Sequence, residues 1–152
     1  MPPLQNELIF GEELSKRSNG LALYVIKKHH NLQHQRRDRV GDRLYDLCAD
    51  MRIKHSAFFN GIGNRLEVNS ENFEVTLKSV MSEILAKNCN FGRVVSLYTF
   101  CIAMSEFCAE NMRDHLNDRF ETIAKKAASA LCDHTDWFES HNSWVSLLVL
   151  DV

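Results

Sequence analysis

Proline is nearly absent from this sequence, and both prolines fall within the first three residues. Because proline interrupts helices, the rest of the chain is free to form long ones. Strand-like alternation of apolar and polar residues is also scarce, whereas apolar residues recur at three- and four-residue spacing in almost every segment. The sequence therefore predicts an all-α protein, and its 152 residues predict a single domain, 1–152.

The sequence also has little that would attract nucleic acid or a membrane. The net charge is -2, too small to gather nucleic acid over the whole surface. The longest apolar stretches, 91–104 with polar interruptions and 145–150, fall short of the roughly 18 to 20 residues that span a bilayer. We therefore expect no nucleic acid partner and no integral membrane anchor.

Paired metal-ligating motifs are missing as well. The five cysteines include no C-x-x-C pair, and their number is odd. The seven histidines have no zinc-finger spacing, although His29, His30 and His34 lie close together. The sequence Gly61-Ile62-Gly63 lacks the third glycine and the preceding strand of a dinucleotide-binding fingerprint. We expect reduced cysteines in an intracellular protein, with no metal, no cofactor and no catalytic residue.

Helical periodicity divides the chain into consecutive amphipathic segments. The stretch that begins at Phe91 is apolar nearly all round, which is typical of a helix enclosed by others. Residues 60–65, NGIGNR, indicate a loop, and Ser70 with the acids after it indicates a capped helix start. The predicted helices cover about 12–32, 35–51, a short stretch to 60, 70–88, 91–110, 116–131 and, as one or two short helices, 136–150.

The basic run KKHHNLQHQRRDR, residues 27–39, could bind phosphates. No aromatic residue lies between its charges, however, and acids such as Asp38, Asp42 and Asp46 follow closely. A solvated helix boundary explains this composition better than a nucleic-acid site.

One arginine stands at the start of the most apolar helix, in the sequence Asn90-Phe91-Gly92-Arg93. Asn90 is a helix-starting residue, and Gly92 lets a foreign backbone come close. Arg93 offers a planar fork for a carboxylate, and a buried guanidinium without a partner is costly. Its partner is either an internal acid such as Glu83 or a carboxylate on another protein.

Three motifs together resemble those of the Bcl-2 family of apoptosis regulators. Asn90-Phe91-Gly92-Arg93 is similar to the family's first motif, N-W-G-R. Trp137 to Trp144, WFESHNSW, is similar to the second, W-I-x-x-N-G-G-W, and the segment around Gly41-Asp42 is similar to the third, L-x-x-x-G-D. Arg37 stands where the third motif has leucine, and Asn142-Ser143 replace two glycines of the second.

The resemblance implies a bundle of about eight helices around a central hydrophobic helix, with a surface groove that receives the BH3 helix of pro-apoptotic relatives. Arg93 would meet an aspartate of that ligand, and Asn90 would form a hydrogen bond nearby. The apolar stripes on residues 40–51 and 73–85 would supply the groove walls, although part of each stripe belongs to the core. The implied groove residues are Asn90, Gly92, Arg93, Leu44, Cys48, Met51, Leu77, Val80, Ile84 and Val95.

The resemblance further implies a non-enzymatic inhibitor of apoptosis in the cytoplasm, with mitochondrial association that depends on partners. The small size and the short connection between the second and fourth helices resemble compact members carried by large DNA viruses, which would act in a host cell. The alternatives are a pore-forming pro-apoptotic member, which Arg37 argues against, and an unrelated all-helical enzyme with a Cys/His site. A homodimer is compatible with the sequence.

Overall fold

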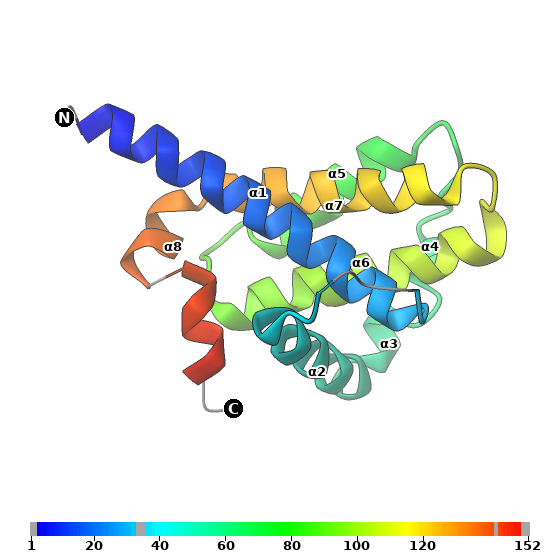
Figure 1. Cartoon of the computed structure of the whole chain (residues 1–152). Coiled ribbons are helices and arrows are strands. Elements are labelled where there is room, and N and C mark those ends of the chain that lie inside the picture. The colour runs from blue at the N-terminus through cyan, green and yellow to red at the C-terminus, as the bar shows by residue number, and fades with distance from the viewer. Residues whose placement is uncertain (1–2, 33–35, 142, 150–152) are drawn as a thin grey trace.

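The computed structural model describes the backbone of residues 3–32, 36–141 and 143–149, and the side chains of these ranges from residue 9 onward. Within this part the chain is helical with no strand, as predicted (Figure 1). The helices are α1 (Pro3–His29), α2 (Arg39–Lys54), α3 (Ser56–Phe59), α4 (Ile62–Arg65), α5 (Phe73–Ile84), α6 (Phe91–Asn111), α7 (Leu116–Cys132), α8 (Thr135–Ser140) and the 3-10 helix η1 (Ser143–Val149).

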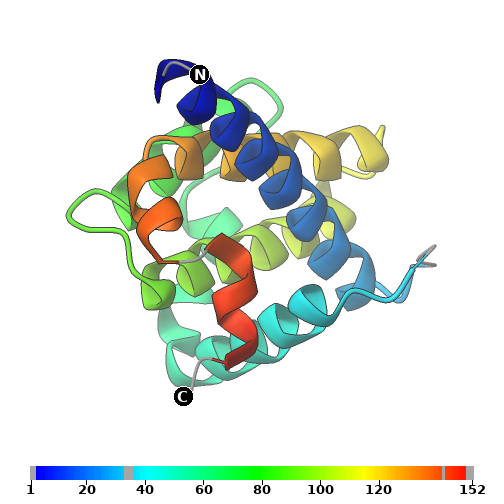
Figure 2. The same cartoon turned by 60° about the vertical axis from the view of Figure 1, so that its left-hand side comes forward.

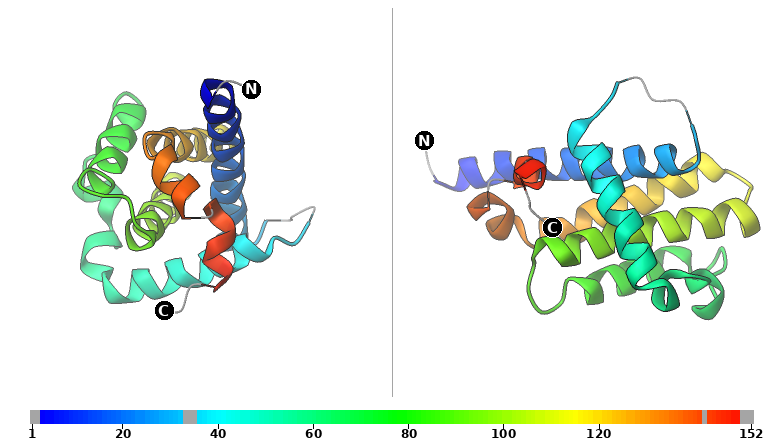
Figure 3. Two further views of the ribbon diagram at one scale, coloured as in Figure 1. Left: turned by 90° about the vertical axis from the view of Figure 1, so that its left-hand side faces the viewer. Right: turned by 90° about the horizontal axis from the view of Figure 1, so that it is seen from below.

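Helix α6 is the central element, and α1, α2, α4, α5 and α7 all contact it (Figures 1 and 2). Its side chains are buried from Val94 to Cys108 with few exceptions. Helices α1 and α7 lie side by side, while α2 crosses α6 on another side of the bundle (Figure 3). The prediction of a central apolar helix at 91–110 is confirmed.

The length of α6 corrects one expectation. Among the described helices, α6 is the one long and apolar enough to cross a bilayer, judged by length and composition alone. The expectation that no segment is long enough to span a bilayer is therefore wrong. The polar residues within α6 shorten its unbroken apolar run, but few of them are charged, so the helix as a whole stays apolar enough. In this fold 72% of the 18-residue apolar stretch within α6 is buried inside the protein, so these side chains build the core.

The C-terminal residues close one end of the bundle. The indole of Trp144 is buried and donates to Ser18 Oγ at 3.0 Å, and the Tyr98 hydroxyl donates to the Ser18 carbonyl at 2.7 Å. Trp137 packs edge-on against Phe91, with 4.9 Å between ring centroids. The two tryptophans thus join η1 and α8 to α1 and α6, while Asn142 lies outside the described residues.

Several predicted helix ends are wrong. Helix α1 ends at His29, not 32, because Asn31 has a positive φ of 56° that a helix cannot continue. Helix α2 begins at Arg39, not 35, because the Asp38 carboxylate accepts from the Gly41 N–H at 3.0 Å and caps it. Residues 33–35, including His34, lie outside the described residues.

The segment after α2 also differs from the prediction. Residues 60–65 are not all loop, since α4 begins directly after Gly61, whose φ is +69°. Helix α5 begins at Phe73, not 70, because the side chains of Asn69 and Asn72 hold residues 69–72 in a turn. No side chain caps α5, so the role predicted for Ser70 is wrong, and α5 ends at Ile84 rather than near 88.

The basic run 27–39 is not a solvated helix boundary throughout. His29 and His30 are half-buried and reach α6, where they contact Glu106 and Ser105 at 2.6 and 2.9 Å. The His30 ring also stacks on Phe120 of α7. These histidines therefore tie α1 to α6 and α7, whereas Arg36 and Arg37 are exposed as expected.

Candidate functional site

The first motif lies at the edge of an apolar pocket between α2 and α6. The pocket has a volume of about 130 Å³ and is open to solvent. We call it the α2–α6 pocket, and its lining residues are Leu47, Asp50, Met51, Lys54, Phe91, Gly92 and Val95. The first and second motifs meet here, because Phe91 packs on Trp137, whereas Gly41 and Asp42 of the third motif lie near the start of α2.

Arg93 occupies the first turn of α6 beside this pocket. The Asn90 side chain accepts from the Arg93 backbone N–H at 2.9 Å and caps the helix. The guanidinium is half-buried and donates one bond, 3.3 Å long, to the Ile84 carbonyl at the end of α5. Among the described residues no carboxylate forms an ion pair with Arg93, Glu83 included. Most of its donor capacity is therefore unused.

The structure divides the other predicted groove residues into two classes. The side chains of Leu44 and Leu77 are fully buried, and that of Cys48 is 1% exposed, so all three belong to the core beneath the surface. Met51, Val80 and Ile84 are half-buried at the surface of α2 and α5. Met51 lies over Ser96, whose hydroxyl contacts the Met51 sulfur at 3.6 Å.

Four residues of the α2–α6 pocket were missed by sequence reasoning: Leu47, Asp50, Lys54 and Phe91. Leu47 and Lys54 lie four residues before and three residues after Met51, and Asp50 lies four residues before Lys54, so all three share one flank of α2 with Met51. That spacing could have identified them, whereas the sequence did not indicate which flank of α2 faces the start of α6.

The third motif is fixed to α1. The Asp42 carboxylate accepts from the Tyr24 hydroxyl at 2.6 Å, from Lys28 Nζ at 2.8 Å and from Arg37 Nε at 2.9 Å. Burial by itself raises the pKa of Asp42, but these donors hold it well below its usual range. Gly41 lies against the Tyr24 ring, where a Cβ would come within 2.4 Å of a ring carbon.

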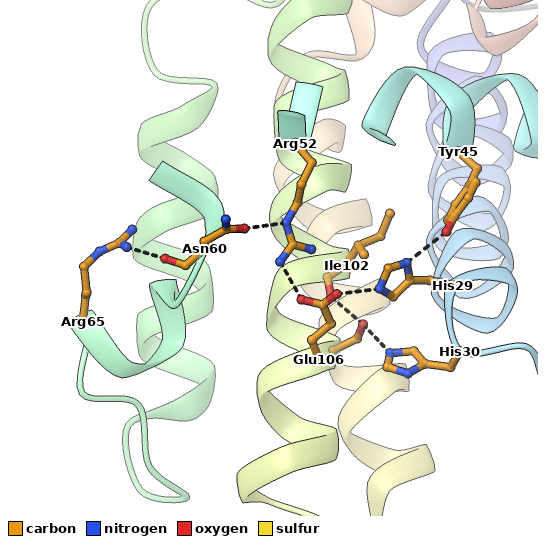
Figure 4. A network of polar contacts seen from close by, with 9 residues as sticks. His29, His30, Tyr45, Arg52, Asn60, Arg65, Ile102 and Glu106 are labelled. Carbon is orange, nitrogen blue, oxygen red and sulfur yellow. Dashed lines mark hydrogen bonds and ion pairs between the residues drawn. The ribbon is translucent and has the colours of Figure 1, made fainter. Parts of the chain in front are cut away.

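The opposite flank of α2 borders a second pocket of about 340 Å³. Its polar edge is a network centred on Glu106, which contacts Arg52 and His29 at 2.6 Å each (Figure 4). Burial raises the pKa of Glu106, but the hydrogen bonds from His29 and Arg52 outweigh it and lower the pKa to about 2. Sequence reasoning missed this network.

The chemistry of the cysteines does not favour a thiol nucleophile. Burial raises the pKa of Cys48 to about 12 and that of Cys89 and Cys108 to about 11, so these thiols stay protonated at neutral pH. Within the described ranges no three His, Cys, Asp or Glu side chains are grouped so that they could hold a metal ion.

Comparisons with known proteins agree with this geometry. The family model described as "Apoptosis regulator proteins, Bcl-2 family" matches residues 44–144. Apoptosis regulator R11 of Xenopus laevis is 20% identical over 115 residues, which are 74% of this chain and 54% of that protein. The chain therefore spans about half the length of this curated relative.

Two solved structures share the fold. The zebrafish pro-survival protein NRZ in complex with Bad BH3 superposes with a TM-score of 0.83 and 21% identity, over 94% of this chain and 97% of that chain. Chicken BOK superposes with a TM-score of 0.78 and 16% identity, over 93% of this chain and 98% of that chain. All of these relatives are from animals, and the resemblance to viral members finds no support among them.

Proposed function

Since this chain belongs to the Bcl-2 family of apoptosis regulator proteins, we propose that it inhibits apoptosis by binding the BH3 helix of pro-apoptotic relatives. Members of the family are intracellular regulators rather than enzymes. The proposed site is a groove with α6 as its floor and α2 and α5 as its walls. The ligand would fill it with apolar side chains at three- and four-residue spacing.

The observation that carries the proposal is that Arg93 has no acidic partner among the described residues. Arg93 directly follows Gly92, a lining residue of the α2–α6 pocket, and its guanidinium has no ion pair with any described carboxylate. A ligand carboxylate could form two parallel hydrogen bonds with it, while apolar side chains of the same ligand enter the pocket beside Gly92 and Val95. NRZ, which has the same fold, is a pro-survival protein bound to a BH3 segment, and this supports the proposal.

A pore-forming, pro-apoptotic role is the second candidate, because chicken BOK, a pro-apoptotic member, also shares the fold. Such a protein would have to release its own third motif to a neighbour's groove. Here Asp42 of that motif is held by Tyr24, Lys28 and Arg37 of the same chain. Arg37, which replaces the anchoring leucine, lies before α2 begins and is exposed. These contacts favour the inhibitor.

A panel of fluorescent BH3 peptides tests the proposal. At least one peptide should bind with a Kd below about 10 µM, an affinity of roughly -7 kcal/mol. The control is the same peptide with its four apolar anchors changed to serine, which should not bind. Absence of binding across the panel would refute helix-in-groove recognition.

A liposome experiment separates the two roles. The inhibitor should leave dye-loaded liposomes intact and should suppress dye release by an added pore-forming relative. Dye release by this protein alone would assign it to the pro-apoptotic class. Any association with mitochondria should then follow the partners it binds.

A further inference from the structure

The network at the far flank of α2 lies outside the proposed groove but contacts the helix that forms its wall. Glu106 follows Gly92 by 14 positions on α6, which is about 21 Å at 1.5 Å per residue. A ligand bound beside Gly92 and Arg93 therefore does not need to touch Glu106. Glu106 contacts the groove wall through Arg52 of α2.

The two carboxylate oxygens of Glu106 hold two different helices. Oε2 accepts from His29 Nε2 at the end of α1, and Oε1 accepts from Arg52 Nη2 on α2 (Figure 4). The side chains of Arg52 and Glu106 are 24% and 32% exposed, so water screens this pair less than an ordinary surface pair.

Arg52 extends the network from α2 to the next two helices. Its Nε donates to the Asn60 side chain at 3.1 Å, in the turn between α3 and α4. The guanidinium of Arg65 on α4 donates in turn to the Asn60 and Phe58 carbonyls. One arginine thus connects the end of α2, the α3–α4 turn and α6.

The position of Arg52 in the sequence links it to the α2–α6 pocket. Met51, the preceding residue, lines that pocket from the other flank of α2. Upstream, the described contacts of α2 with α6 include the Cys48 thiol, which lies 3.7 Å from the Val95 carbonyl. The Arg52–Glu106 ion pair is a further attachment, one turn beyond Cys48 toward the end of α2 and next to Met51, whose sulfur itself contacts Ser96 of α6.

We propose that Glu106 is a positioning residue for the groove: through Arg52 it holds the C-terminal half of α2, and with it Met51, at the distance from α6 that the ligand helix requires. This inference rests on the proposed function. The contact of the same carboxylate with His29 attaches α1 to α6 and does not position the groove.

Three single variants separate the contact of Glu106 with Arg52 from its contact with His29: Glu106→Gln, Arg52→Gln and His29→Gln. Peptide affinity is measured at a temperature where each variant is fully folded, so that loss of stability does not count as loss of binding. Glu106→Gln and Arg52→Gln should each weaken binding by about 3- to 30-fold, the range typical of coupling through packed networks. His29→Gln should change affinity by less than about twofold, within the usual error of additivity.

The double variant Arg52→Gln/Glu106→Gln provides the internal check. It should bind no more weakly than the weaker single variant, because both changes break the same connection. Equal affinity losses in Glu106→Gln and His29→Gln, or full affinity in Glu106→Gln, would overturn the proposal.

Amide hydrogen exchange of the unliganded protein tests whether Glu106 holds α2 without any peptide, so its result does not depend on the proposed function. Amides of residues 50–60 should exchange faster in Glu106→Gln and Arg52→Gln than in His29→Gln. If the wild-type protein binds none of the peptides, the proposed function fails, and exchange still decides whether Glu106 holds α2. The same exchange rates in all three variants would show that it does not.

Discussion

Two glycines of the family motifs serve different purposes in this chain. At Gly41 an added Cβ would lie 2.4 Å from the Tyr24 ring, whereas at Gly92 the nearest side-chain atom among the described residues would be Asn90 Oδ1, at 3.2 Å. Gly41 is thus required by the packing of α2 on α1. Gly92 is exposed and has no comparable internal requirement.

We predict opposite results for alanine at these positions. Gly41→Ala should lower the free energy of unfolding by about 1 to 3 kcal/mol, the usual cost of overpacking. Gly92→Ala should leave stability unchanged or slightly raised, because alanine favours helix over glycine by about 0.5 to 1 kcal/mol. Its methyl group should instead weaken peptide binding roughly tenfold by keeping the ligand backbone away. Urea denaturation and peptide titration of both variants check this, and a destabilised Gly92→Ala would contradict it.

His30 predicts a pH dependence of stability. Burial against α6 and α7 lowers the pKa of its imidazole, with a further decrease from nearby His29, while Glu106 acts in the opposite direction. The unfolded chain therefore takes up the proton first as pH falls. The stability due to neutral His30 is complete above about pH 6.5 and is lost as pH falls from there through the lower folded pKa.

The variant His30→Gln tests this dependence. Its amide can still donate to Ser105 Oγ but does not titrate, so the melting temperature should fall less than that of the wild type below pH 6.5. The matched control is His115→Asn, since that imidazole is 82% exposed. If His30→Gln and wild type showed the same profile, burial of His30 would have no part in the pH response.

At the scale of elements, one attachment of α2 to α1 is the Asp42 carboxylate, which accepts from Tyr24 and Lys28 of α1. Asp42→Ala should lower the free energy of unfolding by about 2 kcal/mol, because it removes three hydrogen bonds to a charged group, one of them from the highly exposed Arg37. Asp50→Ala, on the exposed side of the same helix, should change it by less than about 0.5 kcal/mol. Urea denaturation measures both, and similar losses would show that α2 is held by other contacts.

Helix periodicity was enough to predict each long helix and the central place of 91–110. It could not predict the ends, because these depend on local side-chain hydrogen bonds such as those of Asp38 and Asn72. The same limit applies to the groove. An apolar stripe predicts which face of a helix is covered, but not whether Leu44 and Leu77 contact other helices or a ligand.

The Glu106 network shows a second limit of prediction from the sequence, which concerns contacts between distant residues. Its partners lie 54 and 77 positions away in the sequence, so no spacing rule could connect them. Arg93 and Gly92 were predicted because they stand in one short motif whose residue types have specific uses. Short-range motifs are therefore accessible from the sequence, whereas long-range ion pairs become visible only once the helices are packed.

At the scale of the whole molecule, α1, α2, α4, α5 and α7 contact α6, α8 and η1 close one end of the bundle, and the start of α6 brings the first and second motifs together. The core is formed by residues from each of the long helices. Arg93 stands in the first turn of α6 with one 3.3 Å bond to the Ile84 carbonyl. The central claim is that its guanidinium is kept for a carboxylate of the ligand helix.

The most direct test is a calorimetric double-mutant cycle. Wild-type protein and Arg93→Ala are each titrated with a binding BH3 peptide and with the same peptide after aspartate-to-alanine replacement. Arg93→Ala should melt near the wild-type temperature and bind the unmodified peptide about 30-fold or more weakly, since stranding one charge of a desolvated pair costs about 2 to 5 kcal/mol. With the alanine peptide the two proteins should bind almost equally. An Arg93→Ala protein that is strongly destabilised but binds the unmodified peptide normally would show that Arg93 serves the fold and not the ligand.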